Sequence, residues 1–170
     1  MKVKFLIPSA LFVCIFFSSC LKDTPYMDVS NTAPIIEFGI SPASGNYGPF
    51  AYAGDTAASP VIDTAVALAI ASPQVLTKDV TITIAVDPTQ VTAFNAANGT
   101  NFTVLPSNLY AISSTTIKIQ AGHRVGSIPV SFNFPQFPAS HNYALPLTIT
   151  NGDGLIISGN SGTFMWLFQR

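Results

Sequence analysis

Chemically reactive side chains are sparse and scattered in this chain of 170 residues. The two histidines, His123 and His141, each lie beside a turn and far in sequence from any cluster of carboxylates, a spacing that indicates neither a metal site nor a Ser-His-Asp triad. The eight acidic residues are spread over the chain, whereas a glycosidase needs two carboxylates about 5–10 Å apart in one cleft. No glycine-rich phosphate loop or dinucleotide fingerprint is present. We therefore expect no catalytic residues, no metal site and no cofactor, and we do not expect an enzyme.

Cys20 is the residue for which the sequence indicates a definite chemical fate. A short basic start, Met1–Lys4, precedes the mostly apolar residues 5–17, a run that is too short to cross a bilayer and has the proportions of a secretory signal. The run ends in Phe17-Ser18-Ser19-Cys20, which resembles a bacterial lipobox, where small residues precede a cysteine whose thiol accepts a diacylglycerol. We expect lipidation of Cys20 and attachment to the outer membrane, at the cell surface. A plain membrane anchor and a signal cleaved elsewhere are the alternatives.

The expected signal peptide, residues 1–19, contains Cys14, the only other cysteine, together with Lys2 and Lys4. Its removal leaves no free thiol beside the lipidated Cys20, so thiol catalysis and metal–thiolate sites are excluded. It also leaves five cations against eight acids, a net charge of −3. No basic patch is available, which argues against nucleic acid as a ligand.

Aromatic side chains are the remaining signal of a binding site. Tyr47, Phe50 and Tyr52 lie in residues 44–54, a stretch too rich in glycine and proline for a regular strand. Aromatic rings on a loop can present flat faces to sugar rings, whose axial C–H bonds pack on π surfaces. We take these three residues as candidate glycan-binding residues. The alternative is that they fold back over the edge of the domain as core.

A second aromatic group lies near the end of the chain, where Phe164, Trp166 and Phe168 alternate with Met165 and Leu167. Both faces of this strand are apolar, which is typical of a central strand with two covered faces. Alternatively, one face is an exposed aromatic strip that binds a ligand, so Trp166 is also a candidate glycan-binding residue. A third and weaker candidate is the proline-rich loop around Phe134, Phe137 and His141.

Apolar alternation predicts that most of the chain forms short strands. A period of two, with one apolar face, is typical of half-buried strands. It extends over residues 65–70, 80–86, 117–119, 128–133 and 143–150, and shorter candidates are 35–38, 109–112, 155–157 and 163–169. Turn residues such as Asn151-Gly152-Asp153-Gly154 separate them. The pattern predicts an all-β fold, an antiparallel sandwich of two sheets. Pro129 and Pro146 lie inside strand patterns, so we expect an edge strand or a bulge at each.

One segment predicts a short helix instead. Asp87 can cap it, Pro88 suits its first position, and Gln90 can bond back to the cap. Gly99 would end the helix by adopting a positive φ. We expect about ten residues covering one end of the sandwich, with Val91 and Phe94 as contacts. The whole chain then divides into a signal peptide at 1–19, the lipidated cysteine and a flexible tether at 20–33, and one β-sandwich domain at 34–170.

Three blocks of sequence resemble a Bacteroidota family called domain of unknown function seventeen-thirty-five. The blocks are Phe94 to Pro106 with Leu109-Tyr110, then Ile117 to Gly122, then Tyr143 to Ile149. The resemblance implies an immunoglobulin-like β-sandwich. It also implies a standalone lipoprotein, or the N-terminal module of a surface endoglycosidase of the chitinase-like family, encoded among polysaccharide-utilisation genes. The family has no agreed catalytic residues, so none is assigned to this chain.

Two functions fit these features. The first is a non-catalytic surface lipoprotein that binds a polysaccharide or oligosaccharide. The second is a structural or interaction module that docks on an outer-membrane importer or a neighbouring lipoprotein, using its apolar final strand to pair with a partner.

Overall fold

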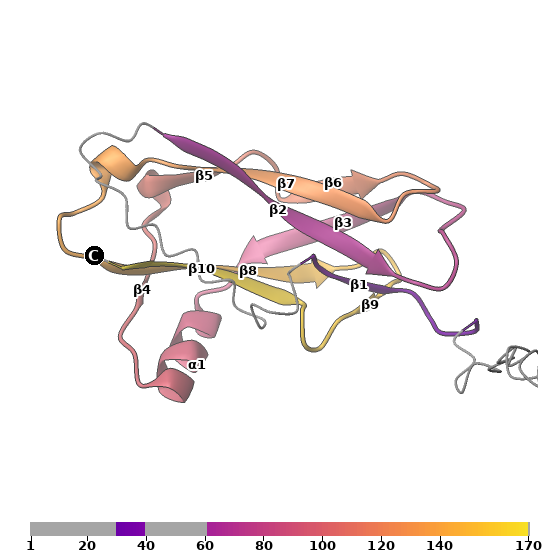
Figure 1. The fold of residues 1–170 in the computed structure, drawn as a ribbon, viewed down its shortest axis with the longest axis horizontal. Helices are drawn as coiled ribbons and strands as arrows, with labels where there is room; N and C mark the ends of the chain where they lie inside the picture. Colours follow the sequence, from indigo (N-terminus) through magenta and orange to yellow (C-terminus); the bar gives the residue numbers. More distant parts are fainter. Residues whose placement is uncertain (1–29, 40–60, 170) are drawn as a thin grey trace, which may run out of the picture.

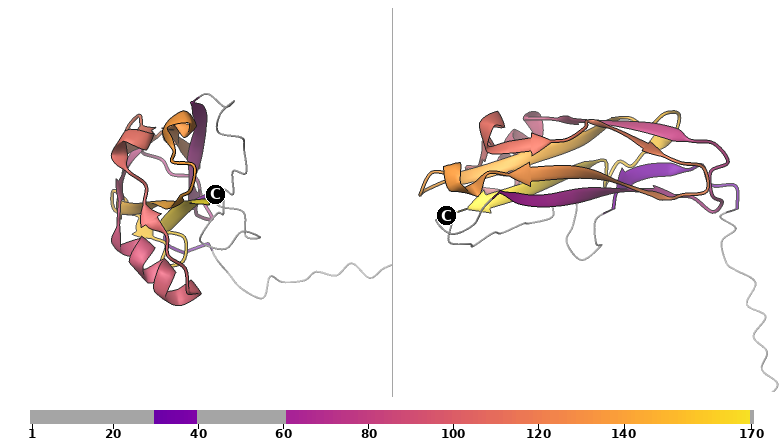
Figure 2. Two further views of the ribbon diagram at one scale, coloured as in Figure 1. Left: turned by 90° about the vertical axis from the view of Figure 1, so that its left-hand side faces the viewer. Right: turned by 90° about the horizontal axis from the view of Figure 1, so that it is seen from above.

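The computed structural model of the chain describes residues 30–39 and 61–169. The expected signal peptide, Cys20 and the aromatic residues Tyr47, Phe50 and Tyr52 lie outside this part of the chain. The described residues form two β-sheets packed face to face, elongated along the strands (Figures 1 and 2).

Each sheet has a well-defined order of strands. The first has the order β5 (Tyr110–Ile112), β7 (Val125–Phe132), β2 (Ile62–Ala71), β1 (Ile35–Phe38) and β9 (Ile156–Ile157). The second has the order β10 (Thr163–Gln169), β8 (Asn142–Asn151), β3 (Val80–Val86) and β6 (Thr116–Ile119), and β4 (Thr103–Val104) also pairs with β8. Most pairs are antiparallel, while β1 with β9 and β4 with β8 are parallel. The expected immunoglobulin-like β-sandwich with one short helix is confirmed.

The core fills the space between the sheets with the inward-facing residues of the alternating strands. Along β2, Val66, Leu68 and Ile70 are buried, while the alanines between them face outward. Aromatic rings dominate the core near one end, where Phe132 packs edge-on against Trp166 and Phe168. Edge-to-face ring pairs of this kind add to the stabilisation that burial alone provides.

The helix α1 (Thr89–Asn98) forms where the sequence predicts it. The Asp87 carboxylate accepts a hydrogen bond from the Thr89 backbone N–H at 3.1 Å, and the Gln90 side chain donates to the same carboxylate at 3.0 Å. The helix ends at Gly99, which has φ 63°. The expected position at one end of the sandwich is wrong, because α1 lies on the outer face of the β10–β8 sheet (Figure 1). Val91 packs there with Ala144 of β8 and Met165 of β10. The contact with α1 explains why the outer face of these two strands carries apolar residues.

Both strand prolines lie in inner strands rather than at sheet edges or bulges, contrary to expectation. The Pro129 carbonyl oxygen accepts from the Ser113 N–H, one residue beyond the end of β5. The Pro146 carbonyl oxygen accepts from the Asp87 N–H, one residue beyond the end of β3. The nitrogen of a strand residue points to the same side as its own carbonyl. Each missing N–H therefore faces a place where the neighbouring strand has ended, and no ladder bond is lost.

The two ends of the sandwich are different. Ser30, the start of the described chain, lies near one end, where Ile156 donates its N–H to the Pro34 carbonyl at 3.1 Å. The opposite end carries β4, the 3₁₀ turns Ser107–Leu109 and Phe134–Gln136, and the last residues of β10 (Figure 1). The connection between β7 and β8 crosses this second end and joins the two sheets.

Candidate functional site

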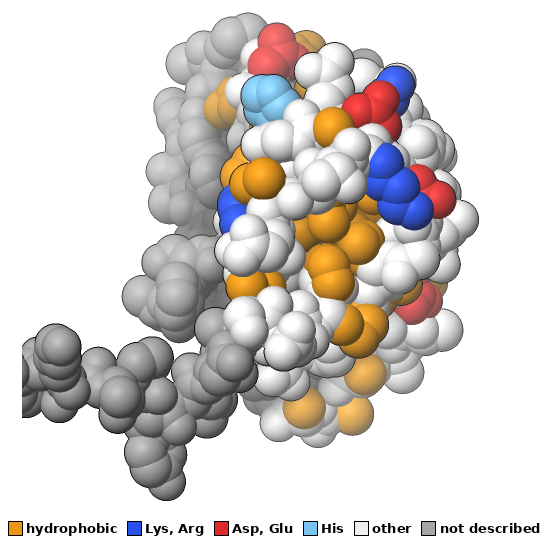
Figure 3. Space-filling model, turned by 90° about the vertical axis from the view of Figure 1, so that its right-hand side faces the viewer, with side chains coloured by type: hydrophobic (Ala, Val, Ile, Leu, Met, Phe, Trp, Pro, Cys, Tyr) orange, Lys and Arg blue, Asp and Glu red, His pale blue; other side chains and the backbone are white. Residues whose placement is uncertain are grey.

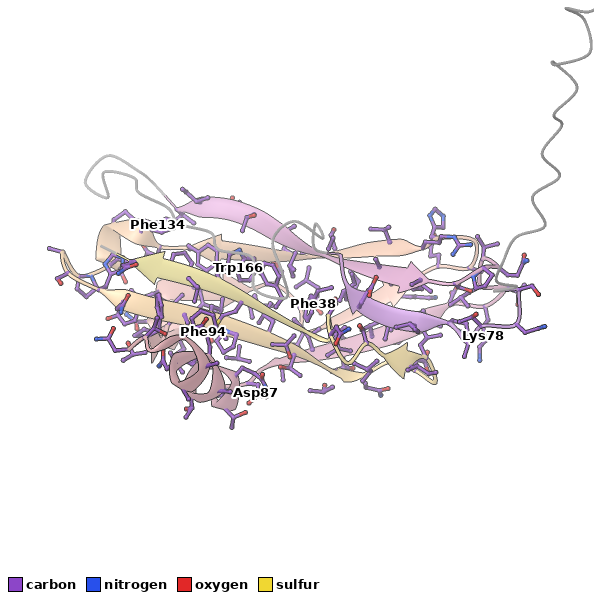
Figure 4. All side chains as sticks on the ribbon, turned by 60° about the horizontal axis from the view of Figure 1, so that its bottom comes forward. Phe38, Lys78, Asp87, Phe94, Phe134 and Trp166 are labelled. Atoms are coloured by element: carbon purple, nitrogen blue, oxygen red, sulfur yellow. The ribbon has the colours of Figure 1, made fainter. Side chains whose placement is uncertain are left out.

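Trp166 lies in the core, not on the surface. Its exposed fraction is 3%, and Figure 4 shows it on β10 in the interior of the sandwich. Its ring packs edge-on against Phe132 and Phe164. A ring buried in this way has no free face for a sugar, so the assignment of Trp166 to glycan binding is wrong. The alternative of a strand with two covered faces is confirmed. The expectation of a central strand is wrong, because β10 is the last strand of its sheet among the described residues, and α1 covers its outer face.

A groove of about 490 Å³ lies at the end of the sandwich away from Ser30, and we call it the terminal groove. It is lined by Asn101, Thr103, Ser140, His141, Asn142, Tyr143 and Gln169. Strand pairing brings these distant positions together, because Thr103 of β4 lies opposite Tyr143 and Gln169 of β10 lies opposite Asn142. A volume of this size falls within the range of about 300–1,000 Å³ that is usual for small-molecule sites.

An aromatic group forms one wall of the terminal groove. The rings of His141 and Tyr143 are nearly parallel, with an interplanar angle of 11° and centroids 5.6 Å apart. Phe137 is buried and meets both rings edge-on, at 82° and 89°. Because Phe137 also packs on Phe134 and Phe168, the groove wall is tied directly to the core.

Hydrogen bonds orient the polar side chains of the groove. The His141 Nδ1 atom lies 2.7 Å from the Pro138 carbonyl oxygen. A carbonyl can only accept, so Nδ1 carries the hydrogen in this contact. The Asn142 amide donates to the Asn101 side-chain oxygen, while its own oxygen is buried without a partner among the described residues. The groove therefore offers both donors and acceptors beside an aromatic surface.

The chemistry of this lining suits recognition of a ligand through hydrogen bonds. Amide and hydroxyl groups can pair with hydroxyl groups of a ligand in either direction. The described residues hold no group of three or more His, Cys, Asp or Glu side chains that could bind a metal ion. Among the described carboxylates, Asp79 pairs with Lys118 at 2.6 Å, Asp87 caps α1, and Asp153 accepts from the Thr81 N–H at 2.9 Å.

The sequence pointed only faintly to the terminal groove. His141 and its proline-rich loop were the weakest of the three aromatic candidates. Asn101, Thr103, Asn142 and Gln169 gave no signal, because the register between strands decides their proximity. The candidates Tyr47, Phe50 and Tyr52 lie outside the described residues, so their assignment stays a prediction.

The opposite end of the sandwich has a different surface. Figure 3 shows apolar side chains gathered there, with charged side chains around them. Val75, Val125 and Ile156 are large apolar residues with about half or more of their surface exposed, at 49%, 62% and 54%. Figure 4 shows Lys78 at this end and Phe134 at the other. None of the helices in the described part of the chain is long and apolar enough to span a membrane.

Comparison with known proteins gives one family and several structures. A family model described as "-like, N-terminal domain" matches residues 43–156. No curated protein matches the chain. A "putative carbohydrate binding protein" from Bacteroides ovatus is similar in structure, with a TM-score of 0.63 and 19% identity over 79% of this chain and 36% of that chain.

Two further structures have the same fold. One is a multidomain protein including DUF1735 from Bacteroides ovatus, with a TM-score of 0.56 and 18% identity over 79% of this chain and 44% of that chain. The other is EndoBT-3987 with Man5GlcNAc product, from Bacteroides thetaiotamicron, with a TM-score of 0.56 and 14% identity over 65% of this chain and 26% of that chain. The chain thus spans less than half the length of each of these three proteins.

Proposed function

We propose that this chain, which belongs to the family whose model is described as "-like, N-terminal domain" and has the fold of a multidomain protein including DUF1735, is a non-catalytic, glycan-binding surface lipoprotein of a polysaccharide-utilisation system. The observation that carries this proposal is the terminal groove, where amide and hydroxyl side chains adjoin the parallel rings of His141 and Tyr143. Sugars offer hydroxyl groups around an apolar C–H face, and this lining matches both.

The structural relatives support a carbohydrate as the ligand class. One is described as a putative carbohydrate binding protein, and another was solved with a bound Man5GlcNAc product. These descriptions belong to proteins more than twice as long as this chain, so their ligands are transferred here only as part of the proposal.

Native affinity electrophoresis of residues 21–170 tests the proposal. The gels contain yeast mannan, xyloglucan, laminarin, pullulan or arabinoxylan. We expect one polysaccharide to retard the protein and its free oligosaccharides to reverse the retardation. In the double variant H141A/Q169A, retardation should fall at least about tenfold, because two hydrogen-bonding groups and one ring face are lost.

A matched control uses the same two residue types at the opposite end of the sandwich. His123 and Gln120 are exposed there and lie outside the groove. The variant H123A/Q120A should migrate like the unchanged protein, and thermal denaturation should show that both variants fold. Migration unaffected by every polysaccharide, or equal effects of both variants, would contradict the proposed role of the terminal groove.

A second function is favoured by the position of β10. Within the described residues, β10 pairs with β8 on one side only and is the last strand of its sheet. An unpaired strand edge can accept a strand from another protein. The second proposal is therefore docking on an outer-membrane importer or a neighbouring lipoprotein. Crosslinked pull-down from native membranes, with a stoichiometric partner lost when proline replaces Leu167, would favour it over glycan binding.

A further inference from the structure

A second depression, which we call the lateral depression, lies near the same end of the sandwich as the terminal groove. Its volume is about 220 Å³, and it is lined by Val61, Asn108, Tyr110, Ala111, Ser131 and Asn133. The volume is below the usual range of about 300–1,000 Å³ for a whole small-molecule site, so one small unit of a larger ligand would fill it.

Strand pairing fixes the residues of the lateral depression. Tyr110 of β5 lies opposite Phe132 of β7, and Ala111 lies opposite Ser131. The Asn133 N–H donates to the Leu109 carbonyl oxygen at 2.9 Å, which ties the end of β7 to the 3₁₀ turn that carries Asn108. The lining therefore rests on the sheet rather than on a free loop.

The polar groups of the lateral depression are unused within the described structure. The side chains of Asn108, Tyr110 and Asn133 make no hydrogen bond with another described residue. Burial raises the pKa of the Tyr110 hydroxyl, which therefore keeps its proton and can donate. Val61, with 50% of its surface exposed, adds an apolar contact beside these groups. Amide and phenol groups also line the terminal groove.

The two sites flank one connection of the chain. Asn133 of the lateral depression and His141 of the terminal groove are the two ends of the segment that joins β7 to β8. This segment crosses from one sheet to the other, and packed sheets lie about 10 Å apart. A ligand that fills both sites must therefore be several sugar units long.

We propose that the lateral depression is a second sugar subsite, and that it holds one part of the same polysaccharide chain whose neighbouring part occupies the terminal groove. This inference rests on the proposed glycan-binding function and names its ligand as an internal stretch of an extended polysaccharide. Joining two weak subsites along one ligand raises the overall affinity, because the second contact becomes intramolecular.

The length of the ligand separates this inference from binding at the terminal groove alone. Isothermal titration calorimetry of residues 21–170 uses oligosaccharides of increasing length, from the disaccharide upward, prepared from the polysaccharide that retards the protein. We expect affinity to rise at least about tenfold once the oligosaccharide is long enough to reach both sites. In the variant N108A/Y110F, this gain should disappear while affinity for the shortest oligosaccharides is unchanged.

Asn160 provides a matched control, because it is an exposed asparagine in the turn before β10 and lines neither site. N160A should keep the full gain with length. A flat dependence on length, or an unchanged gain in N108A/Y110F, would overturn the second subsite and leave the proposed function intact. Absence of binding to every polysaccharide would overturn both together.

Discussion

Asp87 shows how one half-buried side chain can organise the start of a helix. Its carboxylate accepts from the Thr89 N–H and, at 2.6 Å, from the Thr89 hydroxyl, and it also accepts from the Gln90 amide. The hydrogen bond from the Thr89 side chain, followed by that from Gln90, lowers the pKa of Asp87 below its usual value of 3.8. The charged carboxylate is therefore the form that stabilises the fold.

Replacing Asp87 by alanine should lower the free energy of unfolding by about 1 kcal/mol at neutral pH, the usual value of a helix cap. Because folding lowers this pKa, the contribution is present above pH 3.8 and is lost as pH falls through the lower, folded value. Urea unfolding at neutral pH and at progressively lower pH measures this. D87N is the control, since its amide oxygen still accepts from the Thr89 N–H. A cost of D87A that does not change with pH would contradict this account.

At the scale of elements, the turn between β9 and β10 depends on Gly162. A Cβ atom added there would lie 2.5 Å from the Ser158 carbonyl oxygen, whereas one added at Gly159, in the same turn, would meet nothing within 4 Å. Gly162→Ala should therefore lower the free energy of unfolding by about 1–3 kcal/mol, the usual cost of overpacking. Gly159→Ala should change it by less than about 0.5 kcal/mol. Equal urea midpoints for the two variants would contradict this reading of the turn.

The elements were predictable where the cause of their structure is local. Alternation along β3 and β10, the Asp87 cap and the stop at Gly99 all follow from neighbouring residues, and they appear where the sequence places them. The Asn151–Gly154 turn is also local, since Asp153 and Gly154 both adopt positive φ, at 52° and 85°. The element that packs against each apolar face is distant in sequence, so neighbouring residues do not predict it. From the sequence, the apolar residues on both faces of β10 fitted either a central strand or an exposed binding strip. The residues near Met165 in sequence do not indicate that α1 covers its side of the strand.

The candidate site was less predictable than the fold for the same reason. Asn101, Asn142 and Gln169 meet through one parallel and one antiparallel pairing of strands. Their types are common on surfaces, and only the register makes them a group. Trp166 was a stronger candidate from the sequence than these polar residues. However, the alternation of apolar residues along β10 places its side chain on the inward face, where it is buried.

At the scale of the whole molecule, the expected lipid anchor at Cys20 predicts where the protein resides. In the native host, the unchanged protein should take up a labelled fatty acid and sediment with outer membranes. Cys20→Ser should abolish the label and release the protein, because the thiol is the lipid acceptor. Cys14→Ser is the matched control and should retain both properties. Labelling that persists in Cys20→Ser would contradict the lipoprotein assignment.

The terminal groove and the start of the described chain lie at opposite ends of the sandwich, which bears on how an anchored protein would be oriented. The described chain starts beside β9, whereas β8 begins at the terminal groove and runs ten residues toward the starting end. Ten residues of antiparallel strand extend roughly 34 Å. A domain tethered by its first residues therefore works as a spacer. With the proposed anchor at Cys20 and the proposed glycan site in the terminal groove, we expect the domain to hold a polysaccharide about one strand length away from Ser30.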